Sequence, residues 1–269
     1  ERVSPFPEAE WQGLLQYLSF RDMGAYPRLE PFYHELAAWL GVPREWLLLT
    51  SGSEQGIRSV FEVYVRPGDI VVLPRPTFAM YQVYCNQFEA RTSELLYGPA
   101  LELPVERVRD AISPGTRLVA IPNPNSPTGT RFTQEELRRV IERAADVNAL
   151  VLIDEAYYFF YPESALFLVK EYENLVITRT FSKAAGLAGV RLGCVIGQPS
   201  CIDYLRRVQP MEEISGIALR CGEYLLRHDY LIWDYARQAN EGRAFLMERL
   251  RALGLQPFES HGNFVVTRM

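Results

Sequence analysis

Short apolar runs alternate with helical patterns along most of this chain. The clearest run covers residues 149–153, where five apolar residues in succession precede an aspartate. A strand buried on both faces of a parallel sheet has this uninterrupted apolar character, and helices then cover both faces of the sheet. The sequence therefore predicts an α/β fold, with a mostly parallel sheet sandwiched by helices. The expected strands are residues 46–49, 70–73, 118–121, 149–153, 175–178, 192–196 and 263–267, and the clearest helices are residues 30–40, 134–146 and 230–253.

Composition and charge exclude several classes of protein. The chain has 269 residues, of which 48% are hydrophobic and 23% charged, and its formal net charge is -5 with acidic and basic residues interleaved. No run is long and apolar enough to cross a membrane, and no basic face for nucleic acid is indicated. The four cysteines lack metal-ligand spacing, which predicts reduced, mostly buried thiols and no metal site. We therefore expect a cytoplasmic protein with no nucleic-acid or membrane partner.

Three polar segments follow predicted strands. Residues 51–56, 123–129 and 154–157 read SGSEQG, NPNSPTG and DEAY. Ligands of open α/β sheets bind at the carboxyl ends of the strands, where the N-terminus of a following helix also favours a phosphate. Each segment taken alone also has a purely structural explanation. The first is a helix cap, the second a turn, and in the third Asp154 is a cap and Tyr157 a core aromatic residue.

A lysine among hydroxyls and glycines is the strongest chemical signal. Residues 180–191 read TFSKAAGLAGVR, which places Lys183 next to small and hydroxyl-bearing residues and eight positions before Arg191. Such a lysine can hold an aldehyde as a Schiff base while its neighbours hold a phosphate. Pyridoxal 5'-phosphate (PLP) carries both groups, and it also needs an anion opposite its ring nitrogen to act as an electron sink. Asp154, at the end of the apolar run, is the candidate for that anion.

With these four segments in this order, the chain resembles the fold-type I PLP-dependent enzymes, and among them the histidinol-phosphate aminotransferase branch of the class I/II aminotransferases. The resemblance runs from about residue 26 to the end of the chain. It implies that PLP is the cofactor, held by Lys183, whose amino group then moves a proton during catalysis. Asp154 would keep the pyridine nitrogen protonated, and the Tyr157 hydroxyl would hydrogen-bond the ring oxygen.

The resemblance also implies the other contacts of the cofactor. Tyr81 would stack on the pyridine ring. Tyr26 would come from the partner subunit and reach the phosphate, which implies a homodimer with shared sites. The residues expected around the phosphate are Ser53, Glu54, Gln55, Thr180, Ser182 and Arg191.

The chain departs from the family pattern at one residue and at its ends. Many relatives have an asparagine directly before Pro-Thr-Gly, where its amide meets the ring oxygen, whereas this chain has Ser126 there and Asn125 one position earlier. Either residue is a candidate for that contact. The family's substrate-clamping arginines lie beyond residue 269, and an N-terminal arm that covers the site is expected to be missing. We therefore expect an N-terminal segment (1–25), a large PLP-binding domain (26–228), and a linking helix with the start of a truncated, incomplete small α+β domain (229–269).

These features predict a biosynthetic transferase that moves an amino group from an amino donor to a 2-oxo acid. Histidinol phosphate or an aromatic amino acid is the expected type of donor. A decarboxylase of the threonine-phosphate type is an alternative, because it would use the same lysine and aspartate. A non-catalytic PLP-binding sensor domain is disfavoured because no helix-turn-helix or basic segment is present. A nicotinamide dehydrogenase is disfavoured because no G-x-G-x-x-G opens a helix after the first strand.

Overall fold

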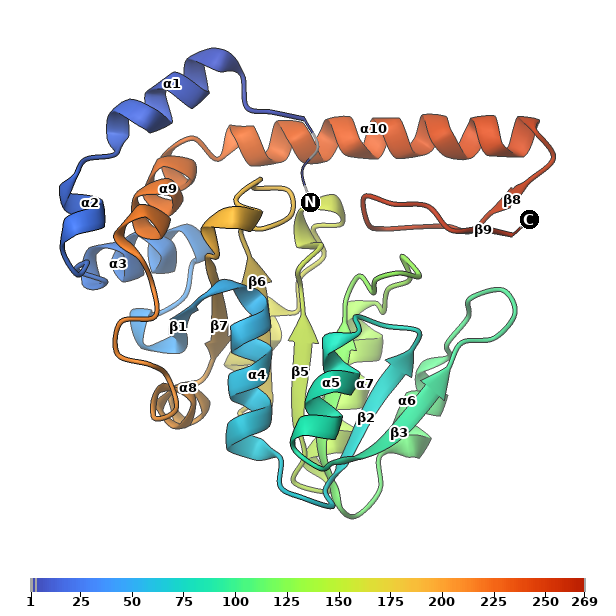
Figure 1. The fold of residues 1–269 in the computed structure, drawn as a ribbon. Coiled ribbons are helices and arrows are strands. Elements are labelled where there is room, and N and C mark those ends of the chain that lie inside the picture. Colours follow the sequence, from blue (N-terminus) through green and yellow to red (C-terminus); the bar gives the residue numbers. More distant parts are fainter. Residues whose placement is uncertain (1, 3, 269) are drawn as a thin grey trace.

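The computed structural model describes residue 2 and residues 4–268. Within this part of the chain, seven strands form one sheet in the order β1-β7-β6-β5-β4-β2-β3 (Figure 1). Neighbouring strands run parallel except at β7, which is antiparallel to both β1 and β6. This arrangement confirms the predicted α/β fold with a mostly parallel sheet. The strands of the sheet are β1 (Leu47–Thr50), β2 (Ile70–Arg75), β3 (Arg91–Leu96), β4 (Thr116–Pro122), β5 (Leu150–Asp154), β6 (Leu175–Thr180) and β7 (Gly193–Gly197).

Helices cover both faces of this sheet, and the longest of them, α10, lies across the carboxyl ends of the parallel strands (Figure 1). The α-helices are α1 (Glu8–Tyr17), α2 (Arg21–Gly24), α3 (Glu30–Leu40), α4 (Gly52–Tyr64), α5 (Met80–Gln87), α6 (Val105–Ala111), α7 (Gln134–Ala145), α8 (Pro199–Arg206), α9 (Gly216–Arg227) and α10 (Tyr230–Ala252). Short 3-10 turns are η1 (Arg44–Trp46), η2 (Tyr158–Phe160), η3 (Leu166–Lys170) and η4 (Ala188–Val190).

Successive side chains of the strands enter two separate apolar cores, one on each face of the sheet. In β4, Leu118 belongs to the core that contains Phe61 of α4, whereas Val119 belongs to the core that contains Val140 of α7. Successive side chains of a strand point to opposite faces of the sheet. A strand between two helical layers therefore needs apolar residues at every position. This requirement explains the continuous apolar runs in the sequence.

Several predicted boundaries are confirmed to within a few residues. The helix predicted at residues 134–146 is α7, and its capping box is present, because the Thr133 hydroxyl accepts from the Glu136 N–H and the Glu136 carboxylate accepts from the Thr133 N–H. The helix predicted from residue 230 is α10. At the first strand, Trp46 ends the 3-10 turn η1 and the strand begins at Leu47.

Three parts of the chain differ from expectation. The sequence did not predict the edge strand β3. The N-terminal segment contains α1 and α2, which pack against α9 and which the sequence did not predict. The strand predicted at residues 263–267 is wrong, because β9 (Thr267–Arg268) pairs only with β8 (Gln256–Pro257). Phe264 instead packs against Tyr157, outside any strand.

The described residues add three general observations. None of their helices combines the length and apolar character needed to span a bilayer. No group of three or more metal-ligating side chains occurs among them. The four cysteines carry free, buried thiols, as predicted.

Candidate functional site

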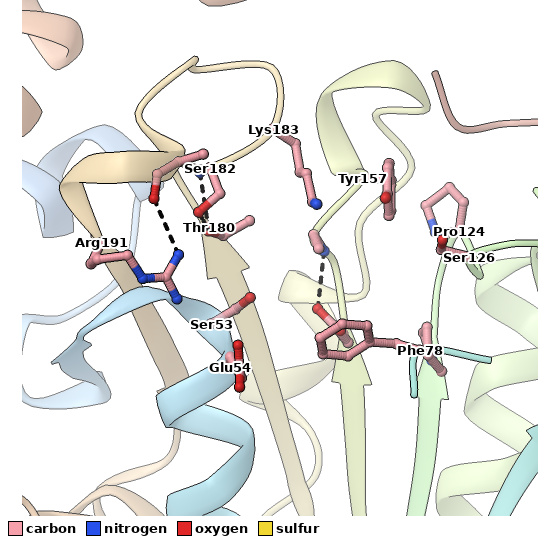
Figure 2. A pocket seen from close by; sticks show the side chains of 14 residues that line it. Ser53, Glu54, Phe78, Pro124, Ser126, Tyr157, Thr180, Ser182, Lys183 and Arg191 are labelled. Carbon is pink, nitrogen blue, oxygen red and sulfur yellow. Dashed lines mark hydrogen bonds between the residues drawn. The ribbon is translucent and has the colours of Figure 1, made fainter. Parts of the chain in front are cut away.

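A pocket of about 140 Å³ opens where β4, β5 and β6 end. It receives side chains from these strand ends, from the first turn of α4 and from the segment after β6 (Figure 2). Parallel strands all present their carboxyl ends at one edge, so segments far apart in the sequence meet there. The lining residues are Ser53, Glu54, Phe78, Pro122, Pro124, Ser126, Asp154, Ala156, Tyr157, Thr180, Ser182, Lys183, Ala188 and Arg191.

Asp154 is the last residue of β5 and lines this pocket, with only 5% of its surface exposed. Its Oδ1 accepts hydrogen bonds from the Thr178 hydroxyl and the Ala156 N–H, both at 3.1 Å. Its Oδ2 accepts one from the Tyr81 hydroxyl at 3.3 Å. Burial raises the pKa of the Asp154 carboxyl to about 6, although these hydrogen bonds and the charge of Lys183 act in the opposite direction. A positively charged group bound beside this carboxylate would favour its ionised form and so offset most of the effect of burial.

The opposite side of the pocket is suited to an anion. Arg191 lies beside the first turn of α4 there, and Thr180 and Ser182 lie next to it (Figure 2). The Ser51 side chain makes no capping hydrogen bond, so the first N–H groups of this 13-residue helix remain for a ligand. The Arg191 guanidinium donates to the carbonyl oxygens of Ser51 and Ala188 at 3.4 and 3.2 Å, which holds it beside the helix start.

Gly193 allows the helix start to come this close to the sheet. A methyl group on its α-carbon would lie 2.6 Å from the Gly52 carbonyl carbon and from the Ser53 backbone nitrogen. Contacts that short do not occur between such atoms, so any larger residue would move the first turn of α4 away from β7. We call the first turn of α4 together with Thr180, Ser182 and Arg191 the anion cradle. The absence of a side chain at Gly193 allows the helix to form one wall of it.

Lys183 lies in the segment after β6 and lines the same pocket. Figure 2 shows its amino group pointing into the cavity beside Tyr157. The Lys183 Nζ is 5.5 Å from the centroid of the Tyr157 ring, within the range of a cation–π contact. The Thr180 hydroxyl donates to the Ser182 Oγ at 2.9 Å, and the Ser182 N–H donates to the Thr180 Oγ at 3.1 Å. These bonds shape the turn that carries the lysine.

Four residues predicted to contact the cofactor do not line this pocket: Tyr81, Asn125, Gln55 and Tyr26. Tyr81 is fully buried in the core between α4 and the sheet, so it cannot stack on a ligand in the pocket. Phe78, three residues earlier, lines the pocket, is 39% exposed and packs edge-on against Tyr81. Sequence reasoning missed Phe78, although it lies in the same PTFAMY segment.

Asn125 is also turned away from the pocket. Its Oδ1 accepts from the Thr77 hydroxyl at 2.8 Å, and its Nδ2 donates to the Pro76 carbonyl at 3.0 Å and to the Thr128 hydroxyl at 2.8 Å. The amide thus joins the NPNSPTG turn to the end of β2. Ser126 is the residue of this pair that lines the pocket.

Gln55 and Tyr26 lie elsewhere. Gln55 follows the two pocket-lining residues of α4 but does not itself line the cavity. Tyr26 is 80% exposed and borders a separate cleft together with Arg21 and Arg28. Within one chain it does not complete the site.

A buried ion pair between the residue that follows Asp154 and the residue that precedes Thr180 is a further feature that the sequence did not reveal. Arg179 Nε and Glu155 Oε2 are 2.9 Å apart, and both side chains are almost completely buried. Glu155 also accepts from the Ser164 hydroxyl and the Ala165 N–H, and the Arg179 guanidinium lies 3.9 Å from the centroid of the Tyr158 ring. Its partners satisfy this pair, which a buried pair needs. It fixes residues 155–165, and with them the backbone that carries Tyr157.

Comparisons with known proteins agree with this geometry. A model of the family described as aminotransferase class I and II matches residues 8–269. Histidinol-phosphate aminotransferase 1 of Trichormus variabilis is 34% identical over 229 residues, which are 85% of this chain and 64% of the relative. Histidinol-phosphate aminotransferase of Symbiobacterium thermophilum is 35% identical over 234 residues, which are 86% of this chain and 64% of that relative. The chain thus spans slightly less than two thirds of the length of these curated relatives.

A solved structure shows the same fold. The crystal structure of histidinol-phosphate aminotransferase from Sinorhizobium meliloti, in complex with pyridoxal-5'-phosphate, superposes with a TM-score of 0.88 at 22% identity. The superposition covers 99% of this chain and 73% of that one. Because the family model matches nearly the whole of this chain, and because of these relatives, the chain belongs to the aminotransferase class I and II family.

Proposed function

We propose that this chain binds PLP through Lys183 and that the protein transfers an amino group from an amino donor to a 2-oxo acid. One observation carries the proposal: a single pocket holds an inward-pointing lysine, a buried carboxylate and an anion cradle. These are the three groups that an aldehyde, a pyridine nitrogen and a phosphate need. The names of the curated relatives and the PLP complex of the Sinorhizobium meliloti enzyme support it.

The residues present fit the cofactor. The Asp154 carboxyl has a raised pKa because it is buried, and a protonated pyridine nitrogen beside it would supply the missing positive charge. Arg191, Thr180, Ser182 and the start of α4 would hold the phosphate. We assign the stacking position to Phe78 and the contact to the ring oxygen to Ser126 and Tyr157, because these side chains line the pocket.

Each residue then has a definite task. Bound PLP supplies a protonated conjugated ring that accepts the electron pair released at the substrate α-carbon. Lys183, once its amino group is free, would take the proton from that carbon on its Nζ and deliver it to the former aldehyde carbon of the cofactor. Asp154 would keep the proton on the ring nitrogen, and the preorganised charge of its carboxylate would stabilise the charge that develops there.

Substrate choice and assembly are further parts of the proposal. We propose a donor similar to histidinol phosphate or an aromatic amino acid, which the names of the curated relatives support. Residues 26–228 would form the cofactor-binding domain, and residues 229–269 would link it to a smaller one. The cytoplasm is the proposed location, in keeping with four free thiols.

A homodimer with shared sites is proposed from the N-terminal segment. Large apolar side chains of α1, α2 and the residues around them are exposed in the single chain, among them Trp11, Leu15, Phe20, Met23 and Tyr26. Apolar side chains grouped in this way are typical of a surface that a partner covers. Tyr26 would reach the phosphate of the partner subunit across that surface.

The attachment of PLP to Lys183 has a direct test, because the chain contains only two lysines, Lys170 and Lys183. The chain mixed with PLP should develop a visible absorbance band that borohydride abolishes, and peptide mapping should place the reduced cofactor on Lys183. Lys170→Ala is the matched control and should behave like the unaltered chain, since Lys170 is exposed at the end of η3. An adduct on Lys170, or an undiminished band in Lys183→Ala, would disprove the proposed attachment.

A further inference from the structure

Tyr157 depends on packing for its orientation. It lines the pocket and lies at the start of the 3-10 turn η2. Among the residues that the structure describes, no hydrogen bond is made by its hydroxyl. The direction of that hydroxyl therefore follows from the position of the ring, and the ring is set by the side chains around it.

Phe264 is the aromatic residue nearest to that ring. The centroids of the Phe264 and Tyr157 rings are 5.3 Å apart and the ring planes meet at 88°, whereas Phe160 lies at 6.3 Å. An edge-to-face pair at this distance is an attractive arrangement and restricts rotation of both rings. Phe264 lies between β8 and β9 without being part of either strand, so strand pairing does not account for its place.

The segment that carries Phe264 is fastened to the turn on another side of the pocket. The His261 N–H donates to the Gly129 carbonyl at 2.8 Å. Gly129 has φ +75°, and a methyl group on it would lie 2.3 Å from the Ser260 hydroxyl and 2.8 Å from the Ser260 α-carbon. Only glycine allows this contact. Gly129 ends the NPNSPTG turn, whose Ser126 lines the pocket, so residues 260–264 touch two of its walls.

Helix α10 holds both partners of the aromatic pair from behind. The Arg243 guanidinium donates to the Gly262 carbonyl, two residues before Phe264. The Asn240 amide donates to the Phe160 carbonyl at 3.1 Å, in the turn that follows Tyr157. In addition, the His261 and Tyr161 rings pack with their centroids 4.6 Å apart. The position of Phe264 relative to Tyr157 is thus fixed through one rigid helix.

We propose that Phe264 is a positioning residue for the site: it holds the Tyr157 ring so that the hydroxyl faces the ring oxygen of the bound cofactor. The role of the Tyr157 hydroxyl rests on the proposed function, whereas the packing that orients it does not. Phe264 acts through Tyr157 and touches no reacting atom. Through residues 260–264, the segment that follows α10 therefore helps to set the geometry of the cofactor pocket.

The first test needs no cofactor. We would place 3-fluorotyrosine at position 157 of the cofactor-free chain and record its fluorine resonance. Phe264→Ala should shift and broaden that resonance, because the ring loses its edge-to-face partner. Phe258→Ala is the matched control: Phe258 is a half-buried aromatic residue of the same segment, and its ring contact is with Arg268. A resonance that Phe264→Ala leaves unchanged, or that Phe258→Ala shifts equally, would overturn the proposal.

The second test uses the chain loaded with PLP. The pH at which the visible absorbance of the lysine-linked cofactor changes form reports the hydrogen bond to its ring oxygen. Phe264→Ala should move this midpoint by about one pH unit, in the same direction as Tyr157→Phe, because one neutral hydrogen bond is worth about that much. Phe264→Tyr keeps the ring and should restore the original midpoint. In the Tyr157→Phe background, Phe264→Ala should have no further effect.

The outcomes separate this inference from the proposed function. Equal midpoint shifts from Phe264→Ala with and without the Tyr157 hydroxyl would overturn the positioning role even though PLP binds. Failure of the unaltered chain to carry PLP on Lys183 would disprove the proposed function, and the fluorine resonance would then decide whether Phe264 orients Tyr157.

Discussion

Asp154 shows at the scale of one residue how a site can cost stability. Its carboxyl is surrounded by Thr178, Ala156 and Tyr81, all of which donate hydrogen bonds to it, but none of the described residues is a positive partner in hydrogen-bond contact with it. Burial outweighs these bonds, so its pKa lies at about 6 rather than the ordinary value of 3.8. Such burial has no benefit for a carboxyl that only caps a helix. It does benefit the binding of a positively charged ligand, because the buried carboxylate then gains the partner that it lacks.

This raised pKa predicts how the stability of the cofactor-free chain depends on pH. Between about pH 4 and pH 6 the folded state binds more protons at Asp154 than the unfolded state does, so this residue makes stability fall as pH rises through that window. A shift of about two pH units corresponds to roughly 3 kcal/mol. In Asp154→Asn this contribution is absent. The free energy of unfolding in urea, compared between the two chains at pH 4 and pH 7.5, checks it; a difference that stays constant with pH would contradict it.

At the scale of elements, the site depends on how closely α4 approaches β7. The strand contributes Gly193, and the helix contributes the turn that contains Gly52 and Ser53. A helix N-terminus attracts an anion over a short range only, so a displacement of its first turn would weaken the cradle even though every polar side chain remained. Packing between two elements therefore controls the electrostatics of the pocket.

Substitution of two glycines by alanine separates this effect from general helix propensity. Gly193→Ala should lower the free energy of unfolding by about 1–3 kcal/mol, because the methyl group meets backbone atoms that cannot move independently. It should also weaken PLP binding. Gly242→Ala, in the middle of α10 with no atom within 4 Å of the new methyl group, should raise stability by about 0.5–1 kcal/mol. Urea unfolding measures the change in stability, and PLP titration measures the change in binding. A change in the free energy of unfolding with the same sign in both variants would show that the close contact at Gly193 is not its cause.

At the scale of the whole molecule, the single chain leaves the proposed phosphate contact of Tyr26 outside its own pocket. Tyr26 is 80% exposed and borders a cleft near α2 and α9. A two-fold dimer presents the same surface on both subunits, so a residue that is remote from its own site can complete the site of the partner. The exposed apolar side chains of the N-terminal segment fit this arrangement.

Mixed dimers test the shared site. Tyr26→Phe should weaken PLP binding roughly tenfold or more, since a hydrogen bond to a charged phosphate is lost. Lys183→Ala cannot hold the cofactor covalently. When equal amounts of the two chains are exchanged, about half of the Tyr26→Phe subunits pair with a partner that has an intact Tyr26, and these should regain tight binding. The borohydride-fixed adduct at low PLP concentration measures the recovery; the absence of any recovery in verified heterodimers would place Tyr26 outside the partner's site.

Much of the fold and part of the candidate site could be predicted from the sequence. The apolar runs predict the strands because a strand buried on both faces needs apolar residues throughout. Lys183, Asp154 and Arg191 were predicted as site residues because each lies in a short segment with its chemical neighbours, and strand ends converge at one edge of a parallel sheet. The structure brings these three side chains into one pocket.

Other features were decided only by contacts between distant segments. Phe78 and Tyr81 are three residues apart and both aromatic, and only the packing of Tyr81 under Asp154 leaves Phe78 to face the pocket. Asn125 and Ser126 are adjacent and both polar, and the position of Thr77 and Pro76 takes the amide away. The sequence by itself therefore determined most strands of the sheet, its clearest helices and the chemistry at the strand ends, because these signals are local. The tertiary structure decided which side chain of a pair faces the cavity and which segment supports it, because burial and hydrogen bonding depend on neighbours that the linear order does not reveal.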